Sequence, residues 1–150
     1  MYDESERPSA PTKEGRRVTA RDAAAAFVKA INSHALDRIA ALMTDDHVFI
    51  DSDGTRHQGK DRMREGWRGY LALVPDYRVI VEETFGRGQM IILLGEAEGT
   101  FVQDGRLEQE NHWRVPAAWR VVVKNGKVSI WQLYVNPEPM ATILKRISGK

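Results

Sequence analysis

A single carboxylate, Asp51, is the residue in this sequence best placed to do chemistry. It ends a short apolar strand pattern, residues 47 to 51, and the turn Ser52 to Gly54 follows directly. A carboxylate that faces a cavity from a strand end loses part of its hydration, and a partly desolvated carboxylate can act as a base near neutral pH. We therefore predict that Asp51 is a general base. The alternative is a carboxylate that only caps the turn.

No other residue pattern indicates a cofactor or a metal. The sequence has no cysteine, which excludes thiol catalysis and thiolate metal sites. His34, His47 and His57 lack the spacing of metal ligands. Glycine-rich phosphate loops and nucleophile elbows are absent from the sequence as well. We expect chemistry that needs neither cofactor nor metal.

Composition narrows the class of protein. The 150 residues hold 22 basic and 21 acidic side chains, a net charge of +1, which argues against nucleic-acid and anionic-membrane partners. The residues after Met1 are polar and acidic, and no apolar run approaches the roughly 20 residues of a membrane helix. A cytoplasmic location is the expectation.

The chain divides into a tail and one domain. Residues 1 to 18 are charged, hold two prolines and predict a disordered tail, and residues 19 to 150 predict a single domain. Thr19 and Asp22 indicate a helix start, with Ala23, Phe27 and Ile31 at helical spacing. Further helices are expected at residues 36 to 43, from about 59 to 71, and at 140 to 147.

Between the third and last helices the pattern is that of long antiparallel strands. We expect strands at residues 77 to 85, 90 to 101, 107 to 124 and 127 to 135. Asn125-Gly126 is the strongest hairpin turn signal, and Pro116 predicts a bulge or bend. The predicted fold class is α+β, with three N-terminal helices packed on a curved antiparallel sheet that encloses a pocket.

In this order, the elements resemble the SnoaL-like branch of the nuclear transport factor two superfamily, which includes ketosteroid isomerases. The matching segments are DDHVFIDSDG, GKDRMREGW, VPDYRV and PAAWRVVVKNGKVSIWQLYVN, within residues 19 to 147. The resemblance implies a cone-shaped fold with a deep pocket, and a homodimer through the sheets. It does not decide the reaction, because the family holds isomerases, cyclases, dehydratases, epoxide hydrolases and non-catalytic modules.

Carried over residue by residue, the resemblance places the ketosteroid isomerase base on Asp51. The tyrosine that donates to the oxyanion falls on Phe27, and the protonated aspartate beside it falls on about Ala118, so both donors are missing. Limonene-epoxide hydrolases carry Trp-x-Asp in the last strand, where this chain reads Trp131-Gln132-Leu133. Neither reaction is expected in its familiar form.

If the resemblance also fixes the strand phase, a second polar set faces the pocket. Glu96 and the pair His112 and Arg114 then share its face, with Arg114 as partner for the Glu96 charge. The alternative is a solvated strand face. The same phase turns Trp119 outward, into or beside a dimer contact.

We predict a protein that binds a small apolar or partly polar molecule. In this reading Asp51, Arg114 and His112 are the catalytic residues of an isomerase, cyclase or hydratase. The predicted substrate-binding residues are Phe27, Trp67, Tyr70, Glu96, Trp131 and Leu133. A non-catalytic ligand carrier or dimeric interaction module is the second hypothesis, since both oxyanion donors are lost.

Overall fold

The structure, a computed structural model, describes residues 18–149. The predicted disordered tail lies outside this range apart from Val18. Two helices open the described chain, α1 (Ala20–Asn32) and α2 (Leu36–Ala41). The start of α1 is a capping box: the Thr19 side chain accepts from the Asp22 N–H, and the Asp22 carboxylate accepts from the Thr19 N–H. The sequence predicted this start correctly.

The strands form a six-stranded sheet in the order β2-β1-β6-β5-β4-β3. The bounds are β1 (Met43–Ile50), β2 (Arg56–Gln58), β3 (Arg78–Arg87), β4 (Met90–Thr100), β5 (His112–Lys124) and β6 (Lys127–Val135). Neighbouring strands run antiparallel except β1 and β6, which are parallel. The sequence predicted neither that parallel pair nor the short β2.

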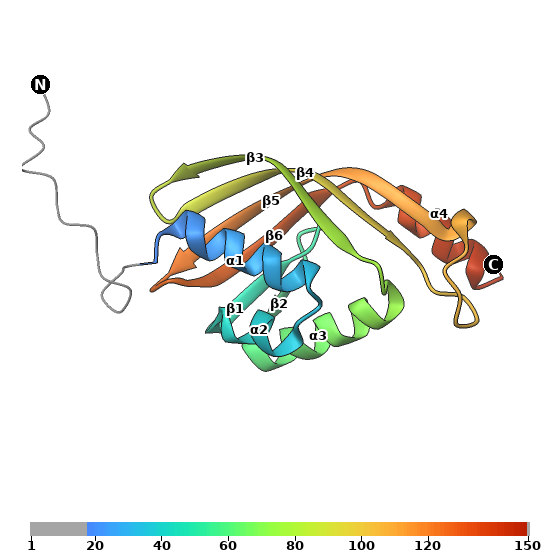
Figure 1. Cartoon of the computed structure of the whole chain (residues 1–150), viewed down its shortest axis with the longest axis horizontal. Coiled ribbons are helices and arrows are strands. Elements are labelled where there is room, and N and C mark those ends of the chain that lie inside the picture. The colour runs from blue at the N-terminus through green and yellow to red at the C-terminus, as the bar shows by residue number, and fades with distance from the viewer. Residues whose placement is uncertain (1–17, 150) are drawn as a thin grey trace, which may run out of the picture.

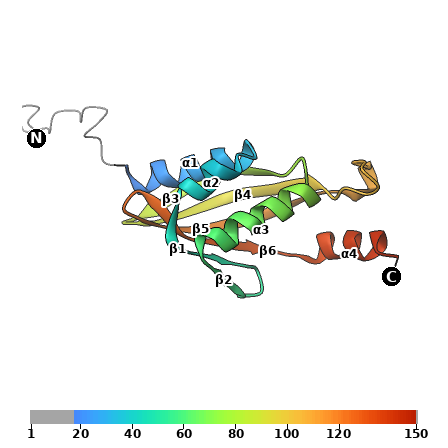
Figure 2. The ribbon, with the colours of Figure 1, turned by 90° about the horizontal axis from the view of Figure 1, so that it is seen from below.

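Helices α1, α2 and α3 (Lys60–Leu73) lie on one side of the curved sheet, as Figures 1 and 2 show. The last helix, α4 (Glu138–Ile147), continues from β6 and extends past the end of the sheet (Figure 2). The α+β architecture is therefore the predicted one. None of the helices in the described part of the chain is long and apolar enough to span a membrane.

Curvature of the sheet has a local cause at Gly95 in β4. The register of β3 against β4 shifts between Val81 and Glu83, which marks a bulge. The carbonyl oxygen of Ile80 lies so close to Gly95 that a Cβ there would be 1.8 Å from it. Only glycine permits this approach, so the bulge in β3 requires Gly95 in the neighbouring strand.

Two predictions about β5 are wrong. Pro116 pairs with Glu96 in unbroken register, so no bulge marks it. The proline is tolerated because β6 pairs with β5 only from Ala117 onward, so Pro116 has no neighbouring strand on the β6 side. Trp119 does not face outward: it is 1% exposed and belongs to the core between sheet and helices.

Candidate functional site

The sheet and α3 enclose a cavity of about 410 Å³, which is within the size range of small-molecule sites. Its wall is built mainly from apolar and aromatic side chains. They come from the end of β1, from α3, from the central strands and from α4. Wall residues include Phe49, Asp51, His57, Arg62, Met63, Trp67, Tyr70, Leu73, Tyr77, Phe101, Trp119, Trp131, Leu133, Val135, Met140 and Leu144.

Asp51 lies in this wall, where β1 ends. A tight hairpin fixes its backbone: the Asp51 N–H donates to the Thr55 carbonyl, and the Asp51 carbonyl accepts from the Gly54 N–H. Gly54 adopts a φ of +86°, which favours glycine. Carboxylate oxygen Oδ1 accepts from the Ser52 N–H at 2.7 Å, so one oxygen is held while Oδ2 has no hydrogen-bond partner within residues 18–149. The half-buried carboxylate thus keeps one free acceptor.

The face of α3 that is turned toward the sheet carries side chains at helical spacing. Met63, Trp67 and Tyr70 line the cavity, because residues three and four apart share a face. The helix begins after Gly59, whose N–H donates to the His47 carbonyl at 2.8 Å. That bond fixes the helix start next to β1. The structure places the predicted residues Trp67, Tyr70, Trp131 and Leu133 in the cavity wall together with Asp51.

Tyr70 and Tyr77 bring two phenol groups to the same wall. Their ring centroids lie 5.0 Å apart at 83°, an edge-to-face contact. Burial raises the pKa of Tyr70 above its ordinary value, and the nearby Asp51 charge adds to this. Burial likewise raises the pKa of Tyr77. Both phenols therefore stay protonated at neutral pH.

His57 and Arg62 supply further polar groups to the cavity wall, and the sequence did not single out either as a site residue. The His57 ring stacks on Phe49 with centroids 5.8 Å apart, because the two residues pair across β1 and β2. Arg62 is an exposed residue of α3 that also borders the cavity. Phe49 shares the period-two face of Asp51, a signal that was available in the sequence.

The second predicted polar set lies on the other side of the sheet. Glu96 and Arg114 do pair, with Oε1 and Nη2 2.6 Å apart, and the arginine holds the pKa of Glu96 below its ordinary value. Their side chains are 27% and 51% exposed, and neither borders the cavity. His112 lies on the same outer face, 3.5 Å from Glu98. The pairing was predicted correctly, but its placement in the pocket was wrong.

The reason is strand phase. Trp113, Val115 and Trp119 are the buried, inward-facing residues of β5, so the residues between them point outward. A shift of one residue in the assumed phase exchanges the two faces of a strand. We call Glu96, Glu98, His112 and Arg114 the outer-face cluster.

Phe27 was predicted to contact the ligand, and the structure places it deeper. It is fully buried, and its ring centroid lies 5.0 Å from that of Trp131. Trp131 borders the cavity whereas Phe27 does not, so Phe27 packs against this wall residue from within the core. Within residues 18–149, no group of three or more histidine or acidic side chains has the geometry to hold a metal ion.

The family model for the SnoaL-like domain matches residues 24–131, and the chain belongs to that family. No curated protein matches the sequence.

Solved structures extend the likeness at the level of the fold. A proposed SnoaL-like polyketide cyclase from Shewanella denitrificans superposes with a TM-score of 0.73 at 14% identity, over 85% of this chain and 97% of that one. An LEH-like epoxide hydrolase from M. tuberculosis gives 0.70 at 18% identity, over 87% and 92%. A ketosteroid isomerase-like fold from Catenulispora acidiphila, in complex with trimethylamine, gives 0.65 at 15% identity, over 75% and 84%.

Proposed function

We propose that the protein binds a mostly apolar small molecule in this cavity and transfers protons on it, with Asp51 as the general base. The observation that carries the proposal is a half-buried carboxylate with a free Oδ2, set in a wall of aromatic and aliphatic side chains. Such an acceptor can take a proton from an acidic carbon or hydroxyl of a bound ligand and return it at another position. The class of reaction is isomerisation, cyclisation or hydration.

Residues around Asp51 support this assignment. The cavity wall combines one carboxylate with the neutral phenols of Tyr70 and Tyr77 and with the side chains of His57 and Arg62. Few polar groups in an apolar wall are what fixes the orientation of a ligand. The outer-face cluster contributes no group to this wall, so Arg114 and His112 have no part in the proposed chemistry.

The test starts from the ligand that the protein itself retains. Native mass spectrometry of the purified chain identifies a bound molecule, and its turnover or its exchange of protons with deuterated solvent is then followed. Asp51→Asn should slow that step by about 10²–10⁴-fold while binding persists. Asp53→Asn is the matched control, because Asp53 is an exposed carboxylate in the same turn. An unchanged rate in Asp51→Asn contradicts the proposal.

A non-catalytic ligand carrier is the second candidate function. The resemblance places the two oxyanion donors of ketosteroid isomerases on Phe27 and on about Ala118. Phe27 is fully buried and does not border the cavity, and Ala118 lies on the outer face of β5, so neither position brings a donor to the cavity. As a carrier, the protein would use Asp51 only as a hydrogen-bond acceptor. Asp51→Asn would then lower the affinity for the retained ligand, and neither the wild type nor the variant would change it chemically.

We also propose that the outer face of the sheet is the contact of a homodimer. Leu94, Ala118 and Tyr134 form neighbouring pairs across β4, β5 and β6 on this face, and Tyr134 is 51% exposed. Charges of both signs border them, as in the Glu96–Arg114 pair. An apolar band bordered by opposite charges suits a second copy of the same face.

A further inference from the structure

Two hydroxyl groups in the cavity wall have no partner in the protein. Tyr70 and Tyr77 both border the cavity, and within residues 18–149 neither phenol oxygen takes part in a hydrogen bond. An accessible hydroxyl in an apolar cavity wall that has no protein partner usually bonds to a ligand or to water. The two hydroxyls therefore mark a place where the cavity offers hydrogen bonds.

Both phenol oxygens remain open to the cavity. The buried side-chain atoms without a partner in the described chain are Thr44 Oγ1, His47 Nε2 and Trp113 Nε1. Neither tyrosine oxygen is among them, although Tyr77 is only 5% exposed as a residue. The accessible part of Tyr77 thus includes its hydroxyl. The ordinary pKa of a tyrosine lies well above neutral pH and burial raises it further for both residues, so each phenol presents an O–H donor at neutral pH.

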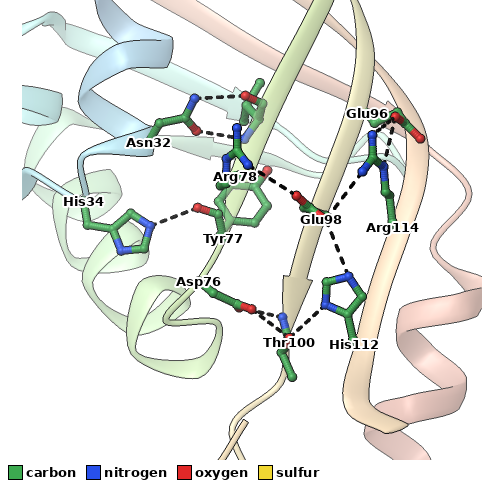
Figure 3. A network of polar contacts seen from close by, with 11 residues as sticks. Asn32, His34, Asp76, Tyr77, Arg78, Glu96, Glu98, Thr100, His112 and Arg114 are labelled. Carbon is green, nitrogen blue, oxygen red and sulfur yellow. Dashed lines mark hydrogen bonds and ion pairs between the residues drawn. The ribbon is translucent and has the colours of Figure 1, made fainter. Parts of the chain in front are cut away.

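Polar contacts of Tyr77, Asp76 and Val79 hold the segment that carries Tyr77, as Figure 3 shows. His34 Nε2 bonds the Tyr77 carbonyl at 2.9 Å. Asn32 bonds both the N–H and the C=O of Val79, at 2.8 and 2.9 Å. On the other side, the Asp76 carboxylate accepts from the Thr100 N–H and from its hydroxyl, both at 2.7 Å.

This bracing connects the cavity to the outer-face cluster. Thr100 Oγ1 already donates to Asp76, so its contact of 3.0 Å with His112 Nδ1 is one in which the histidine N–H donates. His112 Nε2 in turn lies 3.5 Å from Glu98 (Figure 3). A chain of contacts therefore runs from the outer face through Thr100 and Asp76 to the segment that carries Tyr77.

We propose that Tyr70 and Tyr77 form a paired donor site for a neutral acceptor oxygen of the ligand, and that Thr100 and Asp76 are positioning residues for Tyr77. The inference rests on the proposed function and names the class of ligand: an apolar molecule that carries a ketone or ether oxygen. The Asp51 charge disfavours an anionic oxygen beside Tyr70, because like charges in the same cavity repel each other.

The test compares two probes that differ in one oxygen, 2-acetylnaphthalene and 2-ethylnaphthalene. Their affinities are measured by quenching of the intrinsic tryptophan fluorescence, since Trp67, Trp119 and Trp131 border the cavity. Tyr70→Phe and Tyr77→Phe should each lower the affinity for the ketone by roughly 3- to 10-fold, which corresponds to the loss of one neutral hydrogen bond. The hydrocarbon should bind all variants alike. Tyr134→Phe, an exposed phenol on the outer face, is the matched control.

Infrared spectroscopy distinguishes a direct hydrogen bond to the ligand from a purely structural role of the tyrosines. The carbonyl stretch of the bound ketone should lie at lower frequency in the wild type and shift back in the Tyr70→Phe, Tyr77→Phe double variant. Thr100→Val should lower the affinity for the ketone as Tyr77→Phe does, but to a smaller extent. Thr100→Ser, which keeps the hydroxyl, should bind the ketone as the wild type does.

Each result has a distinct meaning. Equal losses for ketone and hydrocarbon, or a carbonyl stretch unchanged by the double variant, overturn the donor site but leave the cavity as a ligand site. Equal weakening of both probes by Thr100→Val overturns the positioning role alone. Failure of the wild type to bind either probe contradicts both this inference and the proposed function.

Discussion

The cavity wall and the outer-face cluster use similar residue types on opposite sides of one sheet. The wall sets Asp51 and two phenols among buried aromatic rings, whereas the cluster sets Glu96 and Glu98 beside Arg114 and the solvent. Solvent screens the outer pair, and its contribution to stability is correspondingly small. The side of the sheet therefore decides whether a carboxylate lies in an apolar cavity or in a solvent-screened ion pair.

Removal of a side chain from the inner face should have the largest effect. Trp119 is 1% exposed, and its ring stacks on Trp131 with centroids 6.0 Å apart. Trp119→Ala should lower the free energy of unfolding by about 3–5 kcal/mol in urea denaturation. Phe85→Ala, an aromatic truncation at a 52% exposed position of β3, should cost much less. Similar losses in the two variants would remove the contrast between the faces.

Introduction of a charge into the outer face tests the proposed homodimer. Ala118→Glu places an unpaired carboxylate in the contact, and an uncompensated buried charge costs about 3–5 kcal/mol. Light scattering should therefore show a dimer for the wild type and a monomer for the variant. Ala72→Glu, on the exposed side of α3, should leave the dimer intact. A wild type that is monomeric at micromolar concentration contradicts the homodimer.

Acidification should weaken the inner core through His47. This residue is fully buried, its Nδ1 bonds the Val128 carbonyl at 2.8 Å, and burial lowers its pKa below the ordinary 6.5. The unfolded chain then takes up the proton first as the pH falls. Stability from this residue is complete above about pH 6.5 and is lost below it, by at most about 1.4 kcal/mol per pH unit.

Urea titrations between pH 7.5 and 5 measure that slope. His47→Gln removes the titrating group, so the variant should lose less stability over this interval than the wild type does, whatever its starting stability. Identical slopes in the two proteins would show that another group is responsible.

The smallest effect is expected from the Glu96–Arg114 pair. Both side chains are partly exposed, so removal of either leaves a charge that water still solvates. Thermal melts of Arg114→Met, Glu96→Gln and the double variant should show small losses that nearly add. If the double variant loses markedly less stability than the two single variants together, the pair is desolvated, as in an interface.

Sequence patterns predicted the helices, the long antiparallel strands and the position of Asp51 at the end of a strand, but not β2. Helical spacing, the capping box at Thr19 and the Asn125-Gly126 turn are local signals, and local signals survive without tertiary information. The segments around Asp51 also resemble a known family. These features together predicted the fold class and the cavity wall around Trp67 and Tyr70.

The face of β5 was not predictable in the same way. Its residues alternate between His112, Arg114 and Ala118 on one side and Trp113, Val115 and Trp119 on the other. The outer face also carries the apolar residues Ala118 and Val122, so the alternation along β5 does not indicate which face is buried. The parallel pairing of β1 with β6 depends on residues some 80 positions apart, and no local pattern reports it.

The central claim is that the ligand binds in the inner cavity and not at the outer-face cluster. An NMR titration of ¹⁵N-labelled protein with 2-acetylnaphthalene tests it directly. The indole N–H signals of Trp67, Trp119 and Trp131 should shift, while that of Trp113, which does not border the cavity, and the backbone signals of Glu96 and Arg114 should stay largely in place. Shifts confined to Glu96, His112 and Arg114, with the three indoles unmoved, would contradict the account.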